Sequence, residues 1–228
     1  MYIKLEISIS IIFIVVIYTL GGKPMKRYGI IGGTFDPIHN AHLYIAYEAK
    51  EQLNLDEVIF MPAGKQPLKA NKVVTDSQLR YEMVKIATES FDEFSVSNYE
   101  IEKGGLSFTY ETLQHFEGKS DVENEEKELF FITGADCLIT IEKWKDVQKI
   151  FSLATLVVFG RDGISKKEMI EKKERIEEKY SGKIIILDLK ELEISSTDIR
   201  ERVNQNRRID FFVPPKVVDM IYENGLYH

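Results

Sequence analysis

The segment Tyr28–His42 reads YGIIGGTFDPIHNAH, and the interpretation of the whole chain starts from it. A short apolar run leads directly into Gly32 and Gly33, which is typical of a β-strand followed by a tight turn. His39 then precedes an amphipathic stretch, and His42 follows three residues later, in the first helical turn. The sequence therefore predicts a strand–loop–helix unit with two glycines after the strand and two histidines at the start of the helix.

Beyond this unit, short apolar runs alternate with amphipathic stretches along the chain. Such alternation is typical of βαβ units and predicts an α/β fold with a doubly wound, mainly parallel, Rossmann-like sheet. Strands are predicted near residues 28–31, 58–61, 94–97, 129–133, 155–159 and 183–187. Helices are predicted over residues 40–53, from a capping box at 75–78 to 90, over 165–180, from 195 onward, and from 214 to 225. No repeat or linker interrupts residues 25–228, which are expected to form one domain.

Two segments rich in polar or charged side chains have simple interpretations. Residues 165–180 carry eleven Lys, Arg and Glu side chains in sixteen positions, which predicts a solvated helix with no further role. Residues 119–128 are polar and acidic and are interpreted as a loop.

Composition excludes several classes of protein. Of the 228 residues, 44% are hydrophobic and 29% are charged, which excludes a disordered tail and a polytopic membrane protein. The net charge of -7 disfavours non-specific binding to nucleic acid, so a polyanionic ligand needs a local site. The single cysteine, Cys137, excludes an intramolecular disulfide framework and favours a reducing compartment. We therefore expect a cytoplasmic protein without a nucleic-acid partner.

The first 24 residues differ from the rest of the chain. Ile7–Leu20 is an uncharged apolar run, but a membrane-spanning helix needs roughly 20 such residues. The following Gly21–Pro24 lacks the small-x-small pattern of a signal-peptide cleavage site. Met25 opens an ordinary cytosolic N-terminus, so we interpret residues 1–24 as sequence upstream of the true start, with a membrane anchor or a signal peptide as the alternatives.

The glycines and histidines of the first unit predict an anion site. Adjacent glycines at the carboxyl end of a strand let a ligand approach the backbone, and a helix start offers free N–H groups to phosphate. The loop matches neither GxGxxG nor the P-loop pattern. His39 and His42 lack Cys, Asp or Glu at ligand spacing nearby, and Zn²⁺ needs three or four ligands, so no metal site is expected.

A second segment, Ile194–Arg200, reads ISSTDIR and follows the last predicted strand. Ser195 or Ser196 is a natural N-cap, so a helix is expected to begin here at the same edge of the sheet. Arg200 lies in the first turn, where the helix dipole disfavours a cation unless an anion is also present. The two segments together predict a phosphate-binding site.

These segments resemble the nucleotidyltransferase superfamily that carries an HxGH motif near the N-terminus and an ISSTxxR motif near the C-terminus. More narrowly, the chain is similar to the bacterial nicotinate-nucleotide adenylyltransferase family over essentially all of residues 25–228. Further matching segments are Ser107–Leu113 (SFTYETL), Phe131–Asp136 (FITGAD), Trp144, Phe159–Arg161 and Val213–Tyr227.

The chain departs from the family pattern at three positions. Ala41 replaces the glycine of HxGH, which is tolerable unless ATP passes very close to it. In the loop beginning at Pro62, Gln66 and Leu68 stand where Pro and His are usual, which puts a ligand contact by Leu68 in doubt, whereas Lys69 still fits.

The resemblance implies transfer of the adenylyl group of ATP to nicotinic acid mononucleotide, with release of pyrophosphate and without a covalent intermediate. It implies that His39, His42 and Arg200 are catalytic, and that Mg²⁺ arrives with ATP. The implied ATP-binding residues are Gly32, Gly33, Thr34, Phe35, His39, His42, Gly134, Asp136, Arg161, Ser195, Ser196, Thr197 and Arg200. The implied residues for nicotinate mononucleotide are Lys69, Thr109, Asp136 and Trp144. The indole of Trp144 would stack on the pyridine ring, while Thr109 and the backbone near Trp144 would hold its carboxylate.

Other functions are distinguished from this one by particular sequence features. His39 argues against a phosphopantetheine adenylyltransferase, where Thr is usual, and the chain is too short and acidic for a class I aminoacyl-tRNA synthetase. A polyol-phosphate cytidylyltransferase would typically lack the Thr109 and Trp144 segments. Preference for nicotinamide over nicotinate mononucleotide, a nucleotide-binding regulator without turnover, and a homo-oligomer remain open.

Overall fold

The computed structural model describes residues 25–65, 74–118, 126–160, 164–190 and 192–228. The N-terminal extension, residues 1–24, lies outside the described residues, and so do its interpretations as upstream sequence, anchor or signal peptide. None of the helices in the described ranges has the length and apolar character needed to cross a membrane.

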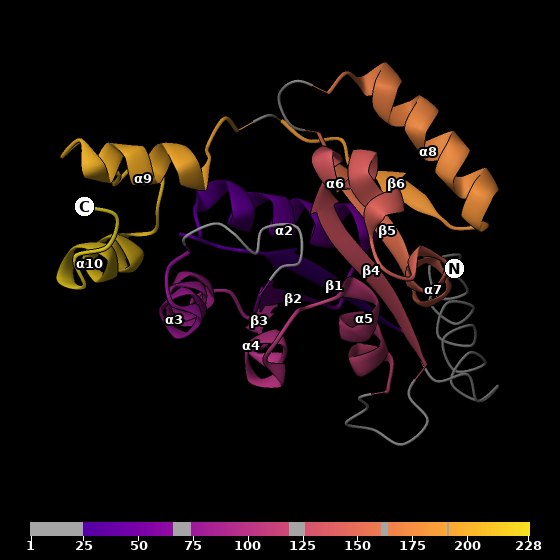
Figure 1. The fold of residues 1–228 in the computed structure, drawn as a ribbon, viewed down its shortest axis with the longest axis horizontal. Helices are drawn as coiled ribbons and strands as arrows, with labels where there is room; N and C mark the ends of the chain where they lie inside the picture. Colours follow the sequence, from indigo (N-terminus) through magenta and orange to yellow (C-terminus); the bar gives the residue numbers. More distant parts are fainter. Residues whose placement is uncertain (1–24, 66–73, 119–125, 161–163, 191) are drawn as a thin grey trace, which may run out of the picture.

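A six-stranded parallel sheet forms the centre of the described structure (Figure 1). Its strands are β1 (Lys26–Gly33), β2 (Glu57–Pro62), β3 (Phe94–Val96), β4 (Lys127–Gly134), β5 (Ala154–Phe159) and β6 (Ile184–Ile186). They lie in the order β3-β2-β1-β4-β5-β6, and all five pairings are parallel. The predicted α/β class and doubly wound sheet are therefore confirmed.

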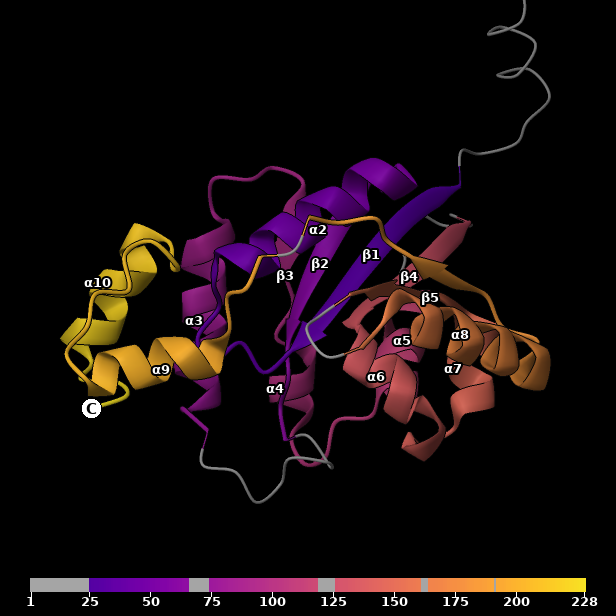
Figure 2. The same ribbon diagram turned by 90° about the horizontal axis from the view of Figure 1, so that it is seen from above.

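Each inner strand sends alternate side chains into two separate cores. Ile31 faces the core that contains α2 (Asn40–Leu53), α3 (Ser77–Thr88), α9 (Ser196–Asn204) and α10 (Pro215–Glu223). Ile30 faces the core that contains α5 (Thr109–Gly118), α6 (Ala135–Thr140), α7 (Val147–Leu153) and α8 (Lys166–Tyr180). Because side chains alternate along a strand, a sheet covered on both faces needs nearly continuous apolar strands. Figures 1 and 2 place α9 and α10 at one end of the molecule and α7 and α8 at the other.

From β1 the sheet continues through β2 to β3 on one side and through β4 and β5 to β6 on the other. The strand order therefore reverses between β1 and β4. Tyr28 pairs with Leu129 of β4 on one side and with Glu57 of β2 on the other. In open α/β sheets the ligand lies outside the carboxyl ends of the strands at this switch point. The ends of β1 and β4 are Gly33 and Gly134, so the fold brings both glycine-containing segments to the expected binding edge.

Most predicted helix boundaries agree with the structure, and one capping residue was wrong. The N-cap of α3 is Asp76, whose carboxylate accepts from the N–H groups of Gln78 and Leu79, instead of Thr75. Aspartate accepts with a charged oxygen, which makes it the stronger cap at this position. Ser195 caps α9 as expected.

The sequence interpretation missed several helices and extended one predicted loop into the strand that follows it. The missed elements are α4 (Tyr99–Lys103), α5, α6, the 3₁₀ turn η2 (Ile141–Lys143) and α7. Apart from α5, which has 10 residues, these elements span one or two turns, so their intrinsic signals are weak and they depend on packing for their stability. The loop predicted over residues 119–128 ends earlier, because Lys127 and Glu128 already belong to β4; residues 119–125 lie outside the described ranges.

Candidate active site

The β1–α2 loop, residues 34–38, ends in a compact arrangement of the two histidines. His39 is the N-cap of α2 and has an extended backbone, with φ of -148° and ψ of 168°. The backbone N–H of His42 donates to the carbonyl of His39 at 2.9 Å, and the N–H of His39 donates to Nδ1 of His42 at 3.3 Å. These reciprocal bonds resemble a capping box and place both histidines at the start of the helix.

The imidazoles of His39 and His42 lie against each other. Their ring centroids are 3.7 Å apart with an interplanar angle of 23°, so the rings are stacked. The edge of Phe35 packs against His42 at 5.0 Å, while His39 is 1% exposed and His42 is partly exposed. Two ring N–H donors at the positive end of a helix dipole suit an anionic ligand.

The start of α9 meets the same loop. The hydroxyl of Ser196 donates to the carbonyl of Pro37 at 2.9 Å, and Arg200 donates through Nη1 to the carbonyl of Asp36 at 2.7 Å. Nη2 of Arg200 donates to the hydroxyl of Thr197 at 3.3 Å. These contacts bridge more than 150 residues of sequence and bring Arg200 to the loop that carries His39.

Arg80 of α3, which the sequence interpretation missed, holds the β1–α2 loop by hydrogen bonds to backbone carbonyls. It is 3% exposed and donates to the carbonyls of Thr34 at 2.6 Å, Ala63 at 2.9 Å and Thr75 at 3.0 Å. Burial lowers the pKa of its guanidinium, and the nearby Asp36 partly opposes that change. An arginine within an amphipathic helix reads as a surface charge, so no sequence signal distinguishes Arg80 from its neighbours.

A first cavity of about 360 Å³ lies between α2 and α8 and against the chain that follows β6, with Ala41 in the first turn of α2 as part of its wall. Its walls are mainly apolar, and the hydroxyl of Tyr44 accepts from the backbone N–H of Lys190 at 3.2 Å, which ties that chain to α2. The lining residues are Ala41, Tyr44, Ile45, Phe159, Gly160, Ile164, Lys166, Met169, Ile170, Ile186, Leu187, Asp188, Leu189, Lys190, Leu192 and Ile194.

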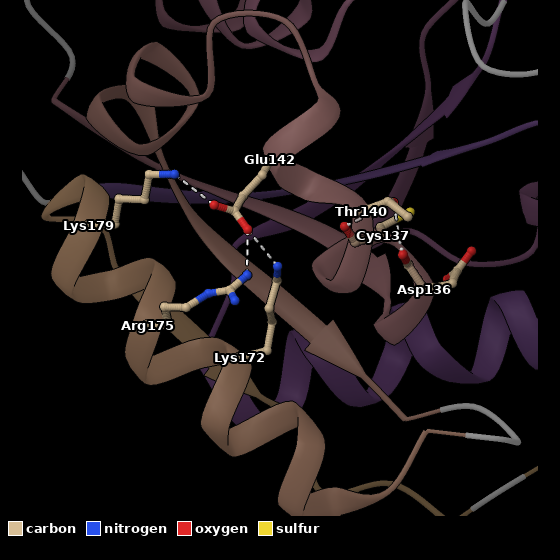
Figure 3. A network of polar contacts seen from close by, with 7 residues as sticks. All are labelled: Asp136, Cys137, Thr140, Glu142, Lys172, Arg175 and Lys179. Atoms are coloured by element: carbon tan, nitrogen blue, oxygen red, sulfur yellow. Dashed lines mark hydrogen bonds and ion pairs between the residues drawn. The ribbon is translucent and has the colours of Figure 1, made fainter.

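The expectation that α8 is only a solvated helix was wrong. Its Met169 and Ile170 line the first cavity, and its cations form a cluster around Glu142 of η2 (Figure 3). The Glu142 carboxylate accepts from Lys172 and Lys179 at 2.8 Å and from Arg175 at 2.5 Å. The bonds from these lysines lower the pKa of Glu142 to about 2. The cluster therefore joins α8 to the segment that carries η2.

A second cavity, of about 520 Å³, lies at the ends of β1 and β4, with Gly32 and Gly33, which precede the β1–α2 loop, as part of its wall. It contains more polar side chains than the first cavity, including two lysines and two carboxylates. The lining residues are Gly32, Gly33, Met61, Ala63, Glu100, Ser107, Phe108, Thr109, Phe131, Thr133, Asp136, Cys137, Thr140, Lys143, Trp144 and Lys145.

Aromatic side chains shape the wall of the second cavity. Trp144 packs edge-to-face on Phe131 with ring centroids 6.1 Å apart, and Nζ of Lys145 lies 4.3 Å from the ring centroid of Phe108. The backbone N–H of Trp144 donates to the carbonyl of Ile141 at 2.9 Å. Because this N–H is already used, a carboxylate bound near Trp144 needs donors from neighbouring groups. Phe108 and Cys137 also line this cavity.

Glu100 of α4 is a buried carboxyl at the wall of the second cavity and was not anticipated from the sequence. It is 9% exposed and accepts from the hydroxyl of Thr112 at 2.7 Å. Burial raises the pKa of Glu100, while the Thr112 bond opposes that rise. The lack of a side chain at Gly64 is required here, since a Cβ would lie 2.5 Å from the carbonyl oxygen of Glu100.

The segment after β4 brings Asp136 to the cavity. Gly134 is the N-cap of α6, and Asp136 follows in the first turn with an exposed side chain. A Cβ at Gly134 would lie 2.6 Å from Oδ1 of Asp136, so a larger residue at this position would displace that carboxylate. On α6, the hydroxyl of Thr140 donates to the carbonyls of Asp136 at 2.9 Å and Cys137 at 3.4 Å (Figure 3).

Several residues expected at the site are placed differently or lie outside the described ranges. Phe35 is 2% exposed, so its side chain packs under His42 and only its backbone can reach a ligand. The hydroxyl of Ser195 accepts from the N–H of Asp198 and is used as a cap. Lys69 and Arg161, together with the departures at Gln66 and Leu68, lie outside the described residues.

The family model described as cytidylyltransferase-like matches residues 30–202. A protein of Clostridium beijerinckii named as a probable nicotinate-nucleotide adenylyltransferase is 73% identical over 203 residues, which cover 89% of this chain and 100% of the relative. A protein of Clostridium perfringens with the same name is 54% identical and covers 89% of this chain and 98% of its own.

Solved structures with the same fold are more distant in sequence. The nicotinic acid mononucleotide adenylyltransferase of Plasmodium falciparum complexed with NaAD has a TM-score of 0.71 at 19% identity, covering 89% of this chain and 97% of that one. The same protein complexed with APC has a TM-score of 0.66 at 17% identity, again covering 89% of this chain and 97% of that one.

Proposed function

The chain belongs to the nicotinate-nucleotide adenylyltransferase family, within the cytidylyltransferase-like proteins, and we propose that it works as such an enzyme. It transfers the adenylyl group of ATP to nicotinic acid mononucleotide, giving nicotinate adenine dinucleotide and pyrophosphate, a step in NAD biosynthesis. The high identity of the curated relatives over their whole length supports this substrate pair.

The observation that carries the proposal within this chain is the pair of cavities beside the β1–α2 loop. Ala41, two residues after His39, lines the first cavity, whereas Gly32 and Gly33 line the second. A reaction that joins two nucleotides needs two binding cavities that meet at a phosphate site. We assign adenosine to the first cavity and the nicotinate mononucleotide to the second, so that their phosphates meet at the histidines.

The chemistry requires positioning more than acid–base catalysis. A phosphate oxygen of the mononucleotide attacks the α-phosphorus of ATP, and the bond from that phosphorus to the bridging oxygen of pyrophosphate breaks. The nucleophile is already an anion, so no general base is required. Holding two reactants in line can lower the barrier by about 7–11 kcal/mol, and donors aimed at developing charge contribute several more.

The roles of the phosphate-binding residues follow from their chemistry. His39 and His42 donate from their ring N–H groups to the α- and β-phosphates in the transition state. Arg200 directs donors not used by Asp36 and Thr197 to the outer phosphates. The first backbone N–H groups of α9, at Ser196 and Thr197, offer further donors, as helix starts do.

In ATP binding, the backbone of Gly32, Gly33, Thr34 and Phe35 lines the path of the phosphates, with Ser195 as the cap that places α9. Gly134 and Asp136 contact a ribose. Arg161 completes the proposed ATP-binding set.

The second cavity contains groups suited to a pyridine carboxylate. The indole of Trp144 offers a face for stacking on the pyridine ring. Thr109, at the first position of α5, and the ammonium groups of Lys143 and Lys145 attract the carboxylate. Lys69 completes the proposed acceptor site.

Magnesium enters as part of the ATP substrate. No group of three or more His, Cys, Asp and Glu side chains suited to a metal occurs in the described parts of the chain. Mg²⁺ often keeps several waters and binds through substrate phosphates, so the residues present fit a Mg²⁺–ATP complex without a protein cage.

Three wider predictions accompany this function. We propose that residues 25–228 act as one domain, because both cores pack on a single sheet. A cytoplasmic location rests on the cysteine content and the net charge. A homo-oligomer stays a prediction from the sequence.

The function is tested by pyrophosphate release. The purified chain is mixed with Mg²⁺–ATP and, in separate reactions, with nicotinate mononucleotide, nicotinamide mononucleotide or no acceptor. We expect rapid release with nicotinate mononucleotide, much slower release with the nicotinamide form, and almost none without an acceptor. Equal rates with both mononucleotides would overturn the acceptor assignment, and no release with either would overturn the proposed function.

A further inference from the structure

Asp36 is a buried carboxylate inside the β1–α2 loop, and the chemistry described above gives it no part. It is 6% exposed and lies three residues before His39. Its Oδ1 accepts from the hydroxyl of Tyr227 at 2.7 Å, and its Oδ2 accepts from the backbone N–H of Thr75 at 3.2 Å. A buried carboxylate needs such donors, because a charge left without partners in the interior is costly.

Tyr227 is 191 residues from Asp36 and is the penultimate residue of the chain. It follows α10 and Gly225, whose φ of 57° turns the backbone, and the N–H of Leu226 donates to the carbonyl of Ile221 at 3.0 Å. The last residues are therefore folded back from α10 toward the loop, and Figures 1 and 2 place the C-terminus beside α9 and α10.

The backbone of Tyr227 has a conformation that a non-glycine residue rarely adopts. Its φ is 69°, in the left-handed region, and such strain persists only where surrounding contacts hold it. Its ring packs partly buried against the core formed with α2, α3, α9 and α10. Burial and the neighbouring Asp36 raise the pKa of Tyr227, so its hydroxyl stays a proton donor.

The other contacts of the loop explain why a small change at Asp36 matters. Arg200 and Ser196 donate to the carbonyls of Asp36 and Pro37, the two residues that lead toward His39. The backbone of this short segment therefore determines where both the imidazoles and the Arg200 guanidinium stand. Tyr227 acts on it through the Asp36 side chain.

We infer that Tyr227 is a positioning residue whose hydroxyl holds Asp36 and thereby sets the place of the His39–His42 pair. This inference rests on the proposed function. Neither Asp36 nor Tyr227 lines either of the two cavities assigned to the substrates. Loss of the hydroxyl should therefore slow the chemical step while leaving the binding of both substrates almost unchanged, because rates depend steeply on alignment.

The test compares Tyr227→Phe with the unsubstituted chain. The ring and its packing remain, and we expect kcat to fall about tenfold while both KM values stay within about twofold. The control is Tyr222→Phe, which removes the hydroxyl of a 45% exposed tyrosine on α10 and should leave kcat unchanged. The double variant Tyr227→Phe with Asp36→Asn should lose no more activity than Asp36→Asn alone, because the two groups act through one bond.

Hydrogen–deuterium exchange supplies a readout that does not depend on turnover. Peptides covering residues 34–39 should exchange faster in Tyr227→Phe than in Tyr222→Phe, with global unfolding temperatures matched to within a few degrees. Unchanged kcat and unchanged exchange in Tyr227→Phe, in a chain that does release pyrophosphate, would overturn the positioning role alone. Absence of turnover in the unsubstituted chain would overturn the proposed function, and the exchange comparison would still decide whether Tyr227 holds the loop.

Discussion

The second cavity is lined by residues just before the β1–α2 loop and the first by a residue just after it, yet their walls come from different kinds of structure. The first is lined mainly by apolar side chains, and part of its wall is the irregular chain that follows β6, at residues 187–190, 192 and 194. The second is lined by short helices that place an indole, hydroxyls, carboxylates and ammonium groups around its space.

This difference bears on how the two nucleotides are recognised. An apolar wall with backbone groups can accept a flat base without particular side chains, so it leaves little pattern in a sequence. On the proposed assignment the acceptor needs defined side chains, and Thr109, Asp136 and Trp144, predicted for it from the sequence, line the second cavity. Residues 34–38 line neither cavity, and the loop leads to His39 and His42, which are proposed to act on the reacting phosphates.

Removing an imidazole from the start of α2 gives the largest expected effect. For His42→Ala we expect kcat to fall by about 100-fold or more, with both KM values changing little, because the lost contacts form in the transition state. Steady-state kinetics with each substrate varied in turn checks this, and His228→Ala is a control at an exposed histidine. Turnover close to that of the unsubstituted chain would remove His42 from the mechanism.

Removing the indole of Trp144 tests the second cavity independently of the first. Trp144→Ala should raise the KM for nicotinate mononucleotide about tenfold through lost stacking, with a smaller change for ATP. Trp144→Phe keeps an aromatic face, so its KM for nicotinate mononucleotide should lie between those of the unsubstituted chain and Trp144→Ala. A larger rise in the KM for ATP would move Trp144 out of the acceptor site.

A charge placed in the first cavity should raise the KM for ATP more than the KM for nicotinate mononucleotide, which is the opposite of the effect expected for Trp144→Ala. Ile170 is 40% exposed on α8, so Ile170→Asp should fold normally and raise the KM for ATP about fivefold by repelling its phosphates, with the acceptor KM unchanged. Lys167→Ala changes the net charge equally outside the cavity lining and serves as the matched control. Equal effects of the two variants on ATP would argue against adenosine in this cavity.

The smallest effects concern stability against pH at two glutamates. The pKa of Glu142 is lowered to about 2, so its stabilisation is present above the ordinary value of 4.5 and is lost as the pH falls toward 2. Burial raises the pKa of Glu100, so its contribution is greatest below 4.5 and decreases as the pH rises through the folded-state pKa.

Denaturant unfolding across a pH series separates these contributions. With Glu142→Gln, the free energy of unfolding should vary less with pH below 4.5. With Glu100→Gln, it should vary less with pH above 4.5. The same change in slope for both variants would contradict the opposite directions of the two pKa shifts.

The regular elements with long patterns were predictable, and the short ones were not. The alternation of apolar strands and amphipathic segments identified all six strands of the described sheet and the long helices α2, α3 and α8. By contrast, α4, α6 and α7 have five to seven residues each. They are too short for helical periodicity to be distinguished and are stabilised by packing on the sheet.

The site shows the same division between local pattern and long-range contact. His39 with His42 and Ser195 with Arg200 lie within single short motifs, so their types and spacing indicate a phosphate site. Arg80, Glu100 and Tyr227 are single residues in ordinary surroundings, and their importance comes from partners between 5 and 191 residues away. The charged pattern of residues 165–180 predicted only a solvated helix, whereas α8 also lines a cavity.

The sequence by itself determined the α/β class, the parallel sheet and the identity of the side chains that suit phosphate, because periodicity and motif spacing are local properties. Only the tertiary structure decided which segments meet at the switch point, where the cavities lie, and which buried groups hold the β1–α2 loop. The physical reason is that a hydrogen bond or a cavity wall depends on distance in space, which folding sets for residues that the chain order keeps far apart.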